Sequence, residues 1–125
     1  MKKEISTSAA PAAIGPYSQG IRIGDLVYTS GQLPIDMTTG AMPDSIEEQT
    51  RCSLSNVKAI LEAAGSGMDK VVKTTVFLKD MNDFAAMNGV YQTFFTAGSF
   101  PARSAVQVAR LPKDALVEIE AVAEA

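Results

Sequence analysis

The sequence predicts an α+β domain in which two helices cover one face of a six-stranded mixed sheet. Two stretches repeat their apolar residues at helical spacing, and short runs rich in β-branched residues stand before, between and after them. The resulting order is strands, helix, strand, helix and two strands, which is typical of an α+β fold. No repeat, low-complexity tract or linker divides the 125 residues, so residues 1–125 are expected to form one domain.

Three short strands are expected in the N-terminal part. The first lies around Glu4–Thr7, and a loop rich in proline and glycine follows it. The next two, Gly20–Ile23 and Leu26–Ser30, are joined at Gly24–Asp25, a dipeptide that favours a hairpin turn. These strands should form an antiparallel pair.

The first helix has a defined start and end. Ser45 and Glu48 fit a capping box, and Gly65 supplies a stop signal. Between them apolar residues recur at Ile46, Leu54, Val57, Ile60 and Leu61. The second helix is expected to begin near Asn82 and to end at Gly98. Its apolar stripe is Phe84, Met87, Tyr91 and Phe94, which we interpret as core.

The remaining strands flank the second helix. Residues 70–80 form a β-branched strand, and the last two strands span about Arg103–Ala109 and Leu116–Ala123. Because the linker between the last two is short, they are expected to pair as an antiparallel hairpin.

The size of the sheet predicts a homo-oligomer. Six strands spaced about 4.8 Å apart span nearly 30 Å, whereas two helices of about 10 Å diameter cover only one face. In the strand at 70–80, Val71 and Phe77 should point away from Val72, Val76 and Leu78, so the second face is also apolar. An exposed apolar face of that size is usually an interface.

Composition excludes several classes of function. The net charge is −3 and the isoelectric point is about 4.8, so no basic surface is expected to attract nucleic acid. The N-terminus lacks the apolar region of a signal peptide, and no apolar run approaches the roughly 20 residues that span a bilayer. We therefore expect a cytoplasmic protein. There is no histidine and only one cysteine, Cys52, which is expected to be a buried thiol, so Ser-His catalysis, disulfides and most metal sites are excluded.

Arg103 is the first candidate for chemistry, because it heads a small apolar strand. A guanidinium suits bidentate recognition of a carboxylate, but a salt bridge within the chain or an exposed strand start would also explain it. Glu118 and Glu120 alternate with apolar residues and so share one strand face. On an exposed face they are ordinary surface acids. In a cleft, one could pair with Arg103 while the other orients a water as general base.

Two loops supply further candidates. Ser30 and Gly31 stand at a strand end, where glycine lets a ligand approach the backbone and leaves an N–H free to donate. Tyr17 follows Pro16 in a loop and could wall a pocket. A plain turn and ordinary packing explain the same residues. Taken together, the candidates suit hydration of an electrophilic carbon in a small 2-substituted acid.

Five sequence blocks resemble one known family. They are "PAAIGPYSQG", "TSGQLP", "VKTTVFLKDMNDFAAMN", "FPARSAVQVARLPKD" and "EIEAVA", and they run in order from residue 11 to residue 123. The chain resembles the Rid (reactive intermediate deaminase) family, also called the YjgF family, close to its RidA branch. The combination of blocks is specific, although no single block is.

The resemblance implies a chorismate-mutase-like fold assembled as a homotrimer, with clefts between subunits. It also implies hydrolysis of 2-imino acids, such as 2-iminobutanoate and 2-iminopropanoate, to 2-oxo acids and ammonia, without cofactor or metal. These imines arise from enamines that pyridoxal-phosphate-dependent dehydratases release. The family's carboxylate-binding arginine falls on Arg103 and its water-positioning glutamate on Glu118. Other pocket positions fall on Tyr17, Ser30, Gly31 and Asn88.

One position departs from the family. Many members have cysteine two residues after the arginine, where this chain has Ala105. The ligand contacts there are implied to be through the backbone, so deamination should persist while pocket volume and substrate preference change. The alternative function is a non-catalytic module that binds 2-oxo acids. A chaperone or ribonuclease has little support, since the chain lacks a basic patch and histidine.

Overall fold

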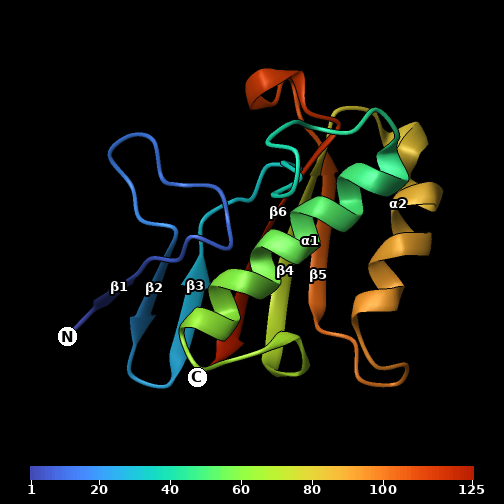
Figure 1. Cartoon of the computed structure of the whole chain (residues 1–125). Helices are drawn as coiled ribbons and strands as arrows, with labels where there is room; N and C mark the ends of the chain where they lie inside the picture. The colour runs from blue at the N-terminus through green and yellow to red at the C-terminus, as the bar shows by residue number, and fades with distance from the viewer.

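The computed structural model describes residues 1–125 as one six-stranded sheet with two helices (Figure 1). The strands are β1 (Lys3–Ile5), β2 (Gly20–Ile23), β3 (Leu26–Thr29), β4 (Val71–Leu78), β5 (Ala102–Gln107) and β6 (Val117–Glu124). The helices are α1 (Ile46–Ala63) and α2 (Phe84–Tyr91), and short 3₁₀ turns occupy Met68–Lys70, Met81–Asp83, Gln92–Phe94 and Pro112–Asp114. The α+β class and the mixed sheet are confirmed.

The strand order is β1-β2-β3-β6-β4-β5, and only the β4–β5 pair is parallel. The expected hairpin between the last two strands is wrong, because β4 lies between β5 and β6. Residues 108–116 cross the end of β4 and bond to it: the Val108 amide donates to the Leu78 carbonyl at 2.9 Å, and the Lys79 amide donates to the Leu116 carbonyl at 3.0 Å. A linker of that length is long enough to step over one strand.

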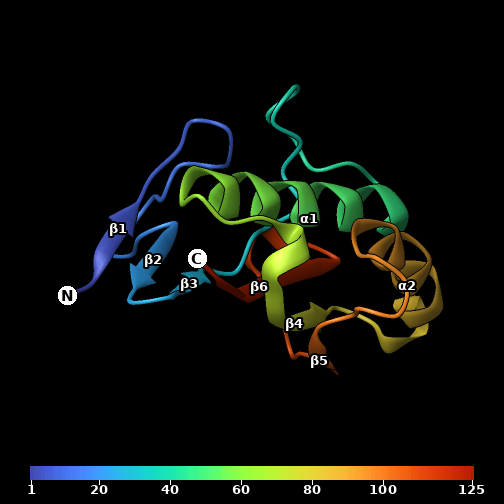
Figure 2. The ribbon, with the colours of Figure 1, turned by 90° about the horizontal axis from the view of Figure 1, so that it is seen from below.

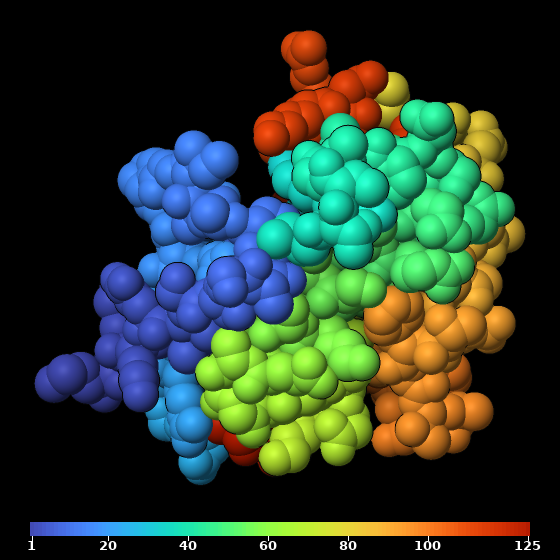
Figure 3. Space-filling model, viewed as in Figure 1, coloured from blue at the N-terminus to red at the C-terminus, as the bar shows by residue number.

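Both helices lie on the same face of the sheet, as Figure 2 shows. Helix α1 packs on β3 and β6, and in Figure 3 only a small part of β6 is visible, at the lower edge beside α1. One of the two bonds of the predicted capping box is formed: Ser45 Oγ accepts a hydrogen bond from the Glu48 amide at 3.1 Å. The apolar stripe of α1 is buried, and the fully buried members are Leu54, Val57, Ile60 and Leu61.

Helix α2 is shorter than predicted. It ends at Tyr91 and continues only as one 3₁₀ turn, whereas Gly98 lies in the turn beyond. The Thr93 hydroxyl donates to the Val90 carbonyl at 2.6 Å. Such side-chain bonds compete with regular helical bonding, which accounts for the early end.

Strand β4 carries an irregularity that the sequence did not predict. Its register with β6 shifts between Val71 and Lys73. Val71 is therefore 8% exposed and faces the core, whereas Val72 is 42% exposed. The predicted orientations of Val71 and Val72 are wrong for this reason, while Val76 and Leu78 are buried and Phe77 faces away from the helices, as expected.

The face of the sheet away from the helices is uncovered in the single chain (Figure 2). We call it the open face; its residues include Tyr28, Phe77, Val106, Glu118 and Glu120. Tyr28 and Val106 are exposed. None of the helices combines the length and the apolar character that crossing a membrane requires.

Candidate functional site

The Arg103 side chain lies in an aromatic pocket between β5 and α2. Residues 84, 88 and 91 follow a spacing of four and three, so Phe84, Asn88 and Tyr91 share the face of α2 that looks toward β5. One terminal nitrogen of Arg103 donates to Asn88 Oδ1 at 2.6 Å. The guanidinium carbon lies 4.8 Å from the Tyr91 ring centroid and 5.3 Å from that of Phe84. We call these four residues the arginine cluster.

No acidic side chain neutralises Arg103. The chain has two ion pairs, Arg51 with Glu48 and Lys79 with Asp114, and neither involves it. Burying an unpaired charge is costly, and ring faces offset only part of that cost. The pocket in front of the guanidinium measures about 490 Å³, enough for a small anion, and is lined by Asn88, Tyr91, Gln92, Phe100, Pro101 and Arg103.

A second cluster forms where β3 ends beside β6. Tyr17, Ser30, Gly31 and Glu118 line one pocket of about 560 Å³, and we call them the glutamate cluster. The backbone brings them together, because the amide of Gln32 donates to the Ile119 carbonyl at 2.8 Å. That bridge lays the turn after β3 along the start of β6.

Position 31 requires a glycine, because the Glu118 carboxylate lies very close to the backbone there. A Cβ atom built there would overlap the carboxylate of Glu118. The absence of a side chain therefore lets this carboxylate lie directly against the backbone.

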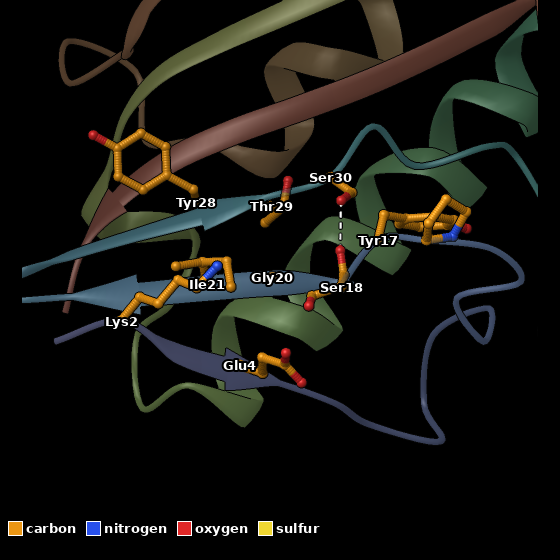
Figure 4. A pocket seen from close by; sticks show the side chains of 10 residues that line it. Lys2, Glu4, Tyr17, Ser18, Gly20, Ile21, Tyr28, Thr29 and Ser30 are labelled. Carbon is orange, nitrogen blue, oxygen red and sulfur yellow. Dashed lines mark hydrogen bonds between the residues drawn. The ribbon is translucent and has the colours of Figure 1, made fainter.

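Ser30 joins the Tyr17 loop to the end of β3. Its hydroxyl donates to the Ser18 carbonyl at 2.6 Å, and its amide donates to the Gln19 carbonyl at 2.9 Å. Figure 4 shows the bond between Ser30 and Ser18 at the end of a further pocket, separate from the two described above. This pocket runs along β1–β3 past Glu4 and Tyr28. Tyr17 itself is 52% exposed.

Glu118 has the electrostatics of a general base. Burial raises the pKa of its carboxyl, and the neighbouring charge of Glu120 raises the pKa further. No hydrogen bond or ion pair in the chain uses this carboxylate. The two glutamates share the open face, as the alternation predicted.

The two clusters do not meet within one chain. Arg103 pairs with Thr74 in the β4–β5 register and contacts α2, so it lies on the helix-covered face. Glu118 pairs with Phe77 on the other side of β4 and projects from the open face. The sheet itself separates them.

Ala105 lies on the same face as Arg103 and packs against the core. It lines neither of the two pockets. A cysteine at this position would therefore place its side chain in core contact on this strand. No three His, Cys, Asp or Glu side chains are grouped so that they could hold a metal ion.

Sequence reasoning missed two aromatic members of the arginine cluster. Phe84 and Tyr91 were assigned to the core stripe of the second helix, and Tyr91 is indeed 4% exposed. Their spacing from Asn88 was the available signal, because it places all three on one helix face next to an unpaired arginine.

Comparisons with known proteins agree with this architecture. The model of the family described as "Endoribonuclease L-PSP" matches residues 7–125. A protein of Salmonella typhimurium strain LT2, named 2-iminobutanoate/2-iminopropanoate deaminase, is 58% identical over 125 residues, covering 98% of each chain.

Two solved structures are similar over nearly the whole chain. The crystal structure of Escherichia coli TdcF with bound serine has a TM-score of 0.92 and 51% identity, and the match covers 98% of both chains. The crystal structure of the yjgF gene product from E. coli has a TM-score of 0.92 and 54% identity over the same shares. This chain belongs to the YjgF/Rid family, whose family model carries the description Endoribonuclease L-PSP.

Proposed function

We propose that this chain is an enzyme that hydrolyses 2-imino acids, such as 2-iminobutanoate and 2-iminopropanoate, to 2-oxo acids and ammonia. The observation that carries the proposal is the half-buried Arg103 guanidinium, which faces a pocket with no acid to neutralise it. The name of the Salmonella relative supports the reaction. The serine bound to TdcF supports a ligand of amino-acid size.

The proposed active site needs two copies of the chain. Because the sheet separates the arginine cluster from the glutamate cluster, a site containing both requires one cluster from each of two subunits. The uncovered open face, with exposed Tyr28 and Val106, offers a surface for that contact. This arrangement fits the expected homotrimer of chorismate-mutase-like, single-domain subunits spanning residues 1–125, with intersubunit clefts.

Binding of the substrate follows from the free donors. Arg103 donates two hydrogen bonds to the substrate carboxylate, since its one hydrogen bond in the chain goes to Asn88 and leaves the other donors free. Backbone groups near Gly31 and Ala105 hold the other end. Tyr17 and Ser30 line the side of the cleft that the second copy supplies.

Glu118 then activates a water. The carboxylate takes a proton as the water oxygen bonds to C2, and the electrons of the C=N bond move to nitrogen. Glu118 returns that proton to the nitrogen of the resulting carbinolamine and is ionised again. The C2–N bond then breaks with its electrons going to nitrogen, and the hydroxyl proton passes to the departing ammonia, which leaves the 2-oxo acid and ammonium. An iminium ion is already electrophilic, so positioning and modest base assistance suffice, and no metal or cofactor is needed.

The raised pKa of Glu118 suits this role. A carboxylate with a higher pKa is a stronger base while it remains ionised near neutral pH. The same proposal includes the cytoplasmic location that the sequence predicts. It also includes small 2-imino acids, and not nucleic acid, as the partners of the site.

A coupled assay tests the proposal. Threonine dehydratase generates the imine, and release of the 2-oxo acid is followed with and without this protein. Wild-type protein is expected to speed release above the spontaneous rate, and Arg103→Ala is expected to return it to that rate with the fold intact by circular dichroism. If Arg103→Ala clears imine at the wild-type rate, the role of Arg103 is wrong.

Glu118→Gln separates the enzyme from the alternative binding module. A module keeps its 2-oxo acid ligand and has no turnover to lose, whereas the enzyme slows by about 10²-fold or more while it still binds. Native mass spectrometry of the wild-type protein measures the number of chains in the assembly independently.

A further inference from the structure

We propose that Tyr91, anchored by Thr74, is a positioning residue that fixes the Arg103 guanidinium in the orientation that receives the ligand carboxylate. The identity of the ligand rests on the proposed function, whereas the positioning itself stands on the geometry of the arginine cluster alone.

The guanidinium needs more than its one hydrogen bond to be held in place. Arginine carries a long side chain with several rotatable bonds, and the bond from Arg103 to Asn88 Oδ1 fixes only one of its nitrogens. The Tyr91 and Phe84 rings both lie within contact of the guanidinium carbon, at 4.8 and 5.3 Å from their centroids. Ring contacts of this kind set the plane of a guanidinium.

Tyr91 is itself fixed from both ends. Its hydroxyl lies 2.7 Å from Thr74 Oγ1, and the two residues are 4% and 1% exposed. The Phe95 ring packs on Tyr91 at a centroid distance of 4.9 Å and an interplanar angle of 43°. Helix, strand and ring neighbour therefore leave Tyr91 one orientation.

The position of Thr74 ties this anchor to the arginine. Thr74 is the register partner of Arg103 in the parallel β4–β5 pair. The hydroxyl that holds Tyr91 and the guanidinium that Tyr91 faces are thus carried by neighbouring positions of adjacent strands. A displacement of Thr74 on β4 would therefore also displace Arg103 on β5.

Tyr91 orients Arg103 without neutralising it. Burial raises the pKa of the Tyr91 phenol, against smaller lowering effects of Thr74 and of the Arg103 charge. The phenol stays neutral at physiological pH, so the positive charge of Arg103 remains available to an anion. An apolar side chain of similar size would fill the same space but would lack the hydroxyl that Thr74 holds.

Four variants separate positioning from simple packing. Tyr91→Leu removes the ring and the hydroxyl, Tyr91→Phe and Thr74→Val remove only the hydrogen bond, and Thr74→Ser keeps the hydrogen bond. We expect Tyr91→Leu to raise the KM for the imino acid about tenfold. The two hydrogen-bond variants should raise it about threefold, Thr74→Ser should match wild type, and kcat should stay within about twofold throughout.

Nitrogen-15 NMR reports on Arg103 directly and needs no ligand. Its Nε–H proton should resonate upfield of those of Arg22, Arg51 and Arg110, because only Arg103 faces aromatic rings. Arg103→Lys assigns the signal. Tyr91→Leu should move the Arg103 signal toward those of the other three arginines, and Thr74→Val should move it in the same direction by less. If Tyr91→Leu fails to fold, the shift in Thr74→Val still tests the inference.

Phe95→Leu is the matched control, because it removes a half-buried ring that touches Tyr91 but not Arg103. It should lower the melting temperature and leave the KM and the Arg103 signal near wild type. An unchanged KM and signal in Tyr91→Leu and Thr74→Val would overturn the inference, and so would equal shifts in Phe95→Leu. If the wild type shows no turnover, the proposed function fails, and the NMR signal still decides whether Tyr91 positions Arg103.

Discussion

The arginine cluster and the glutamate cluster are built in different ways. The first is closed by packed elements: α2 supplies a hydrogen bond and two rings to Arg103, and β4 anchors one of those rings. The second is open, since Tyr17 is exposed and the Glu118 carboxylate has no polar side-chain partner. Within a single chain, the side chain of Arg103 is therefore held by its neighbours, whereas the carboxylate of Glu118 is not. Under the proposed function, this difference predicts that ligand binding is set within one subunit, whereas the reaction depends on assembly of two or more.

Mixing two impaired variants gives the largest effect that this comparison predicts. Arg103→Ala and Glu118→Gln chains, unfolded together and refolded, should form mixed assemblies, which are trimers under the proposed function, and some of their clefts should combine an intact arginine cluster with an intact glutamate cluster. At equal amounts about a quarter of the clefts are restored. Activity in the imine assay should therefore rise to about a quarter of the wild-type level, although the Arg103→Ala sample is inactive and the Glu118→Gln sample is slowed by about 10²-fold or more.

Separately refolded samples that are combined without exchange of subunits are the control and should show no such rise. The lack of a rise in the mixed assemblies, confirmed by native mass spectrometry, would show that both clusters must come from the same chain.

Gly31→Ala changes the glutamate cluster and leaves the arginine cluster as it is. The added Cβ would overlap the Glu118 carboxylate, which must then move away from the backbone. Misplacement of a catalytic group by about 1 Å can cost 10²-fold, so kcat/KM should fall by about 10- to 100-fold. Binding of a 2-oxo acid, measured by calorimetry, checks whether the arginine cluster keeps its affinity.

Gly89→Ala is the matched control for that substitution. Gly89 lies on α2, and a Cβ there meets nothing within 4 Å. Turnover should stay at the wild-type level. Wild-type turnover in Gly31→Ala would mean that the position of Glu118 does not limit the reaction.

Glu120→Gln tunes the same base without moving it. The charge of Glu120 is the second cause of the raised pKa of Glu118, after burial. Removing this charge lowers the pKa of Glu118, so the acid side of the pH–rate profile should move to lower pH. Because burial remains, the pKa should stay above the ordinary value, and the plateau rate should fall slightly as the base weakens. A profile that moves to higher pH, or that does not move, contradicts this account.

Ala105→Cys should have the smallest effect. The Ala105 side chain packs against the core and lines neither pocket. The KM for 2-iminobutanoate and 2-iminopropanoate should change by less than about twofold. A change in the ratio of the two KM values would show that this strand position reaches the substrate.

Local patterns predicted most of the fold. The Ser45 cap, the apolar stripe of α1 and the Gly24–Asp25 turn act within a few residues of themselves, and the structure contains all three. The pairing of the last strands is a long-range choice. A short linker favours a hairpin, but the apolar β4 takes a neighbour on both edges.

The irregularities had no sequence signal. Nothing in the run from Val71 to Lys73 marks the register shift that turns Val72 outward. The early end of α2 lies beside a bond from the Thr93 hydroxyl to the Val90 carbonyl, a contact that apolar periodicity does not reveal.

The sequence left open whether Arg103 forms a salt bridge within the chain, is an exposed strand start or awaits an anion. The structure removes the first alternative, because neither ion pair involves Arg103, while the role of the residue stays a prediction. Whether Arg103 and Glu118 share a face depends on register, because Arg103 pairs with Thr74 and Glu118 with Phe77, and positions 74 and 77 of β4 lie on opposite faces. Neither register is encoded in the local spacing of the two residues.

The segment that crosses the end of β4 has a consequence for protein engineering. Residues 108–116 look like a surface loop, the usual place to insert a tag or a binding peptide. Both ends of this segment are pinned to the same strand through Leu78 and Lys79, so its length sets how far the β5 strand can slide relative to β6. Extra residues belong instead in the exposed turn around Gly40, which lines neither pocket.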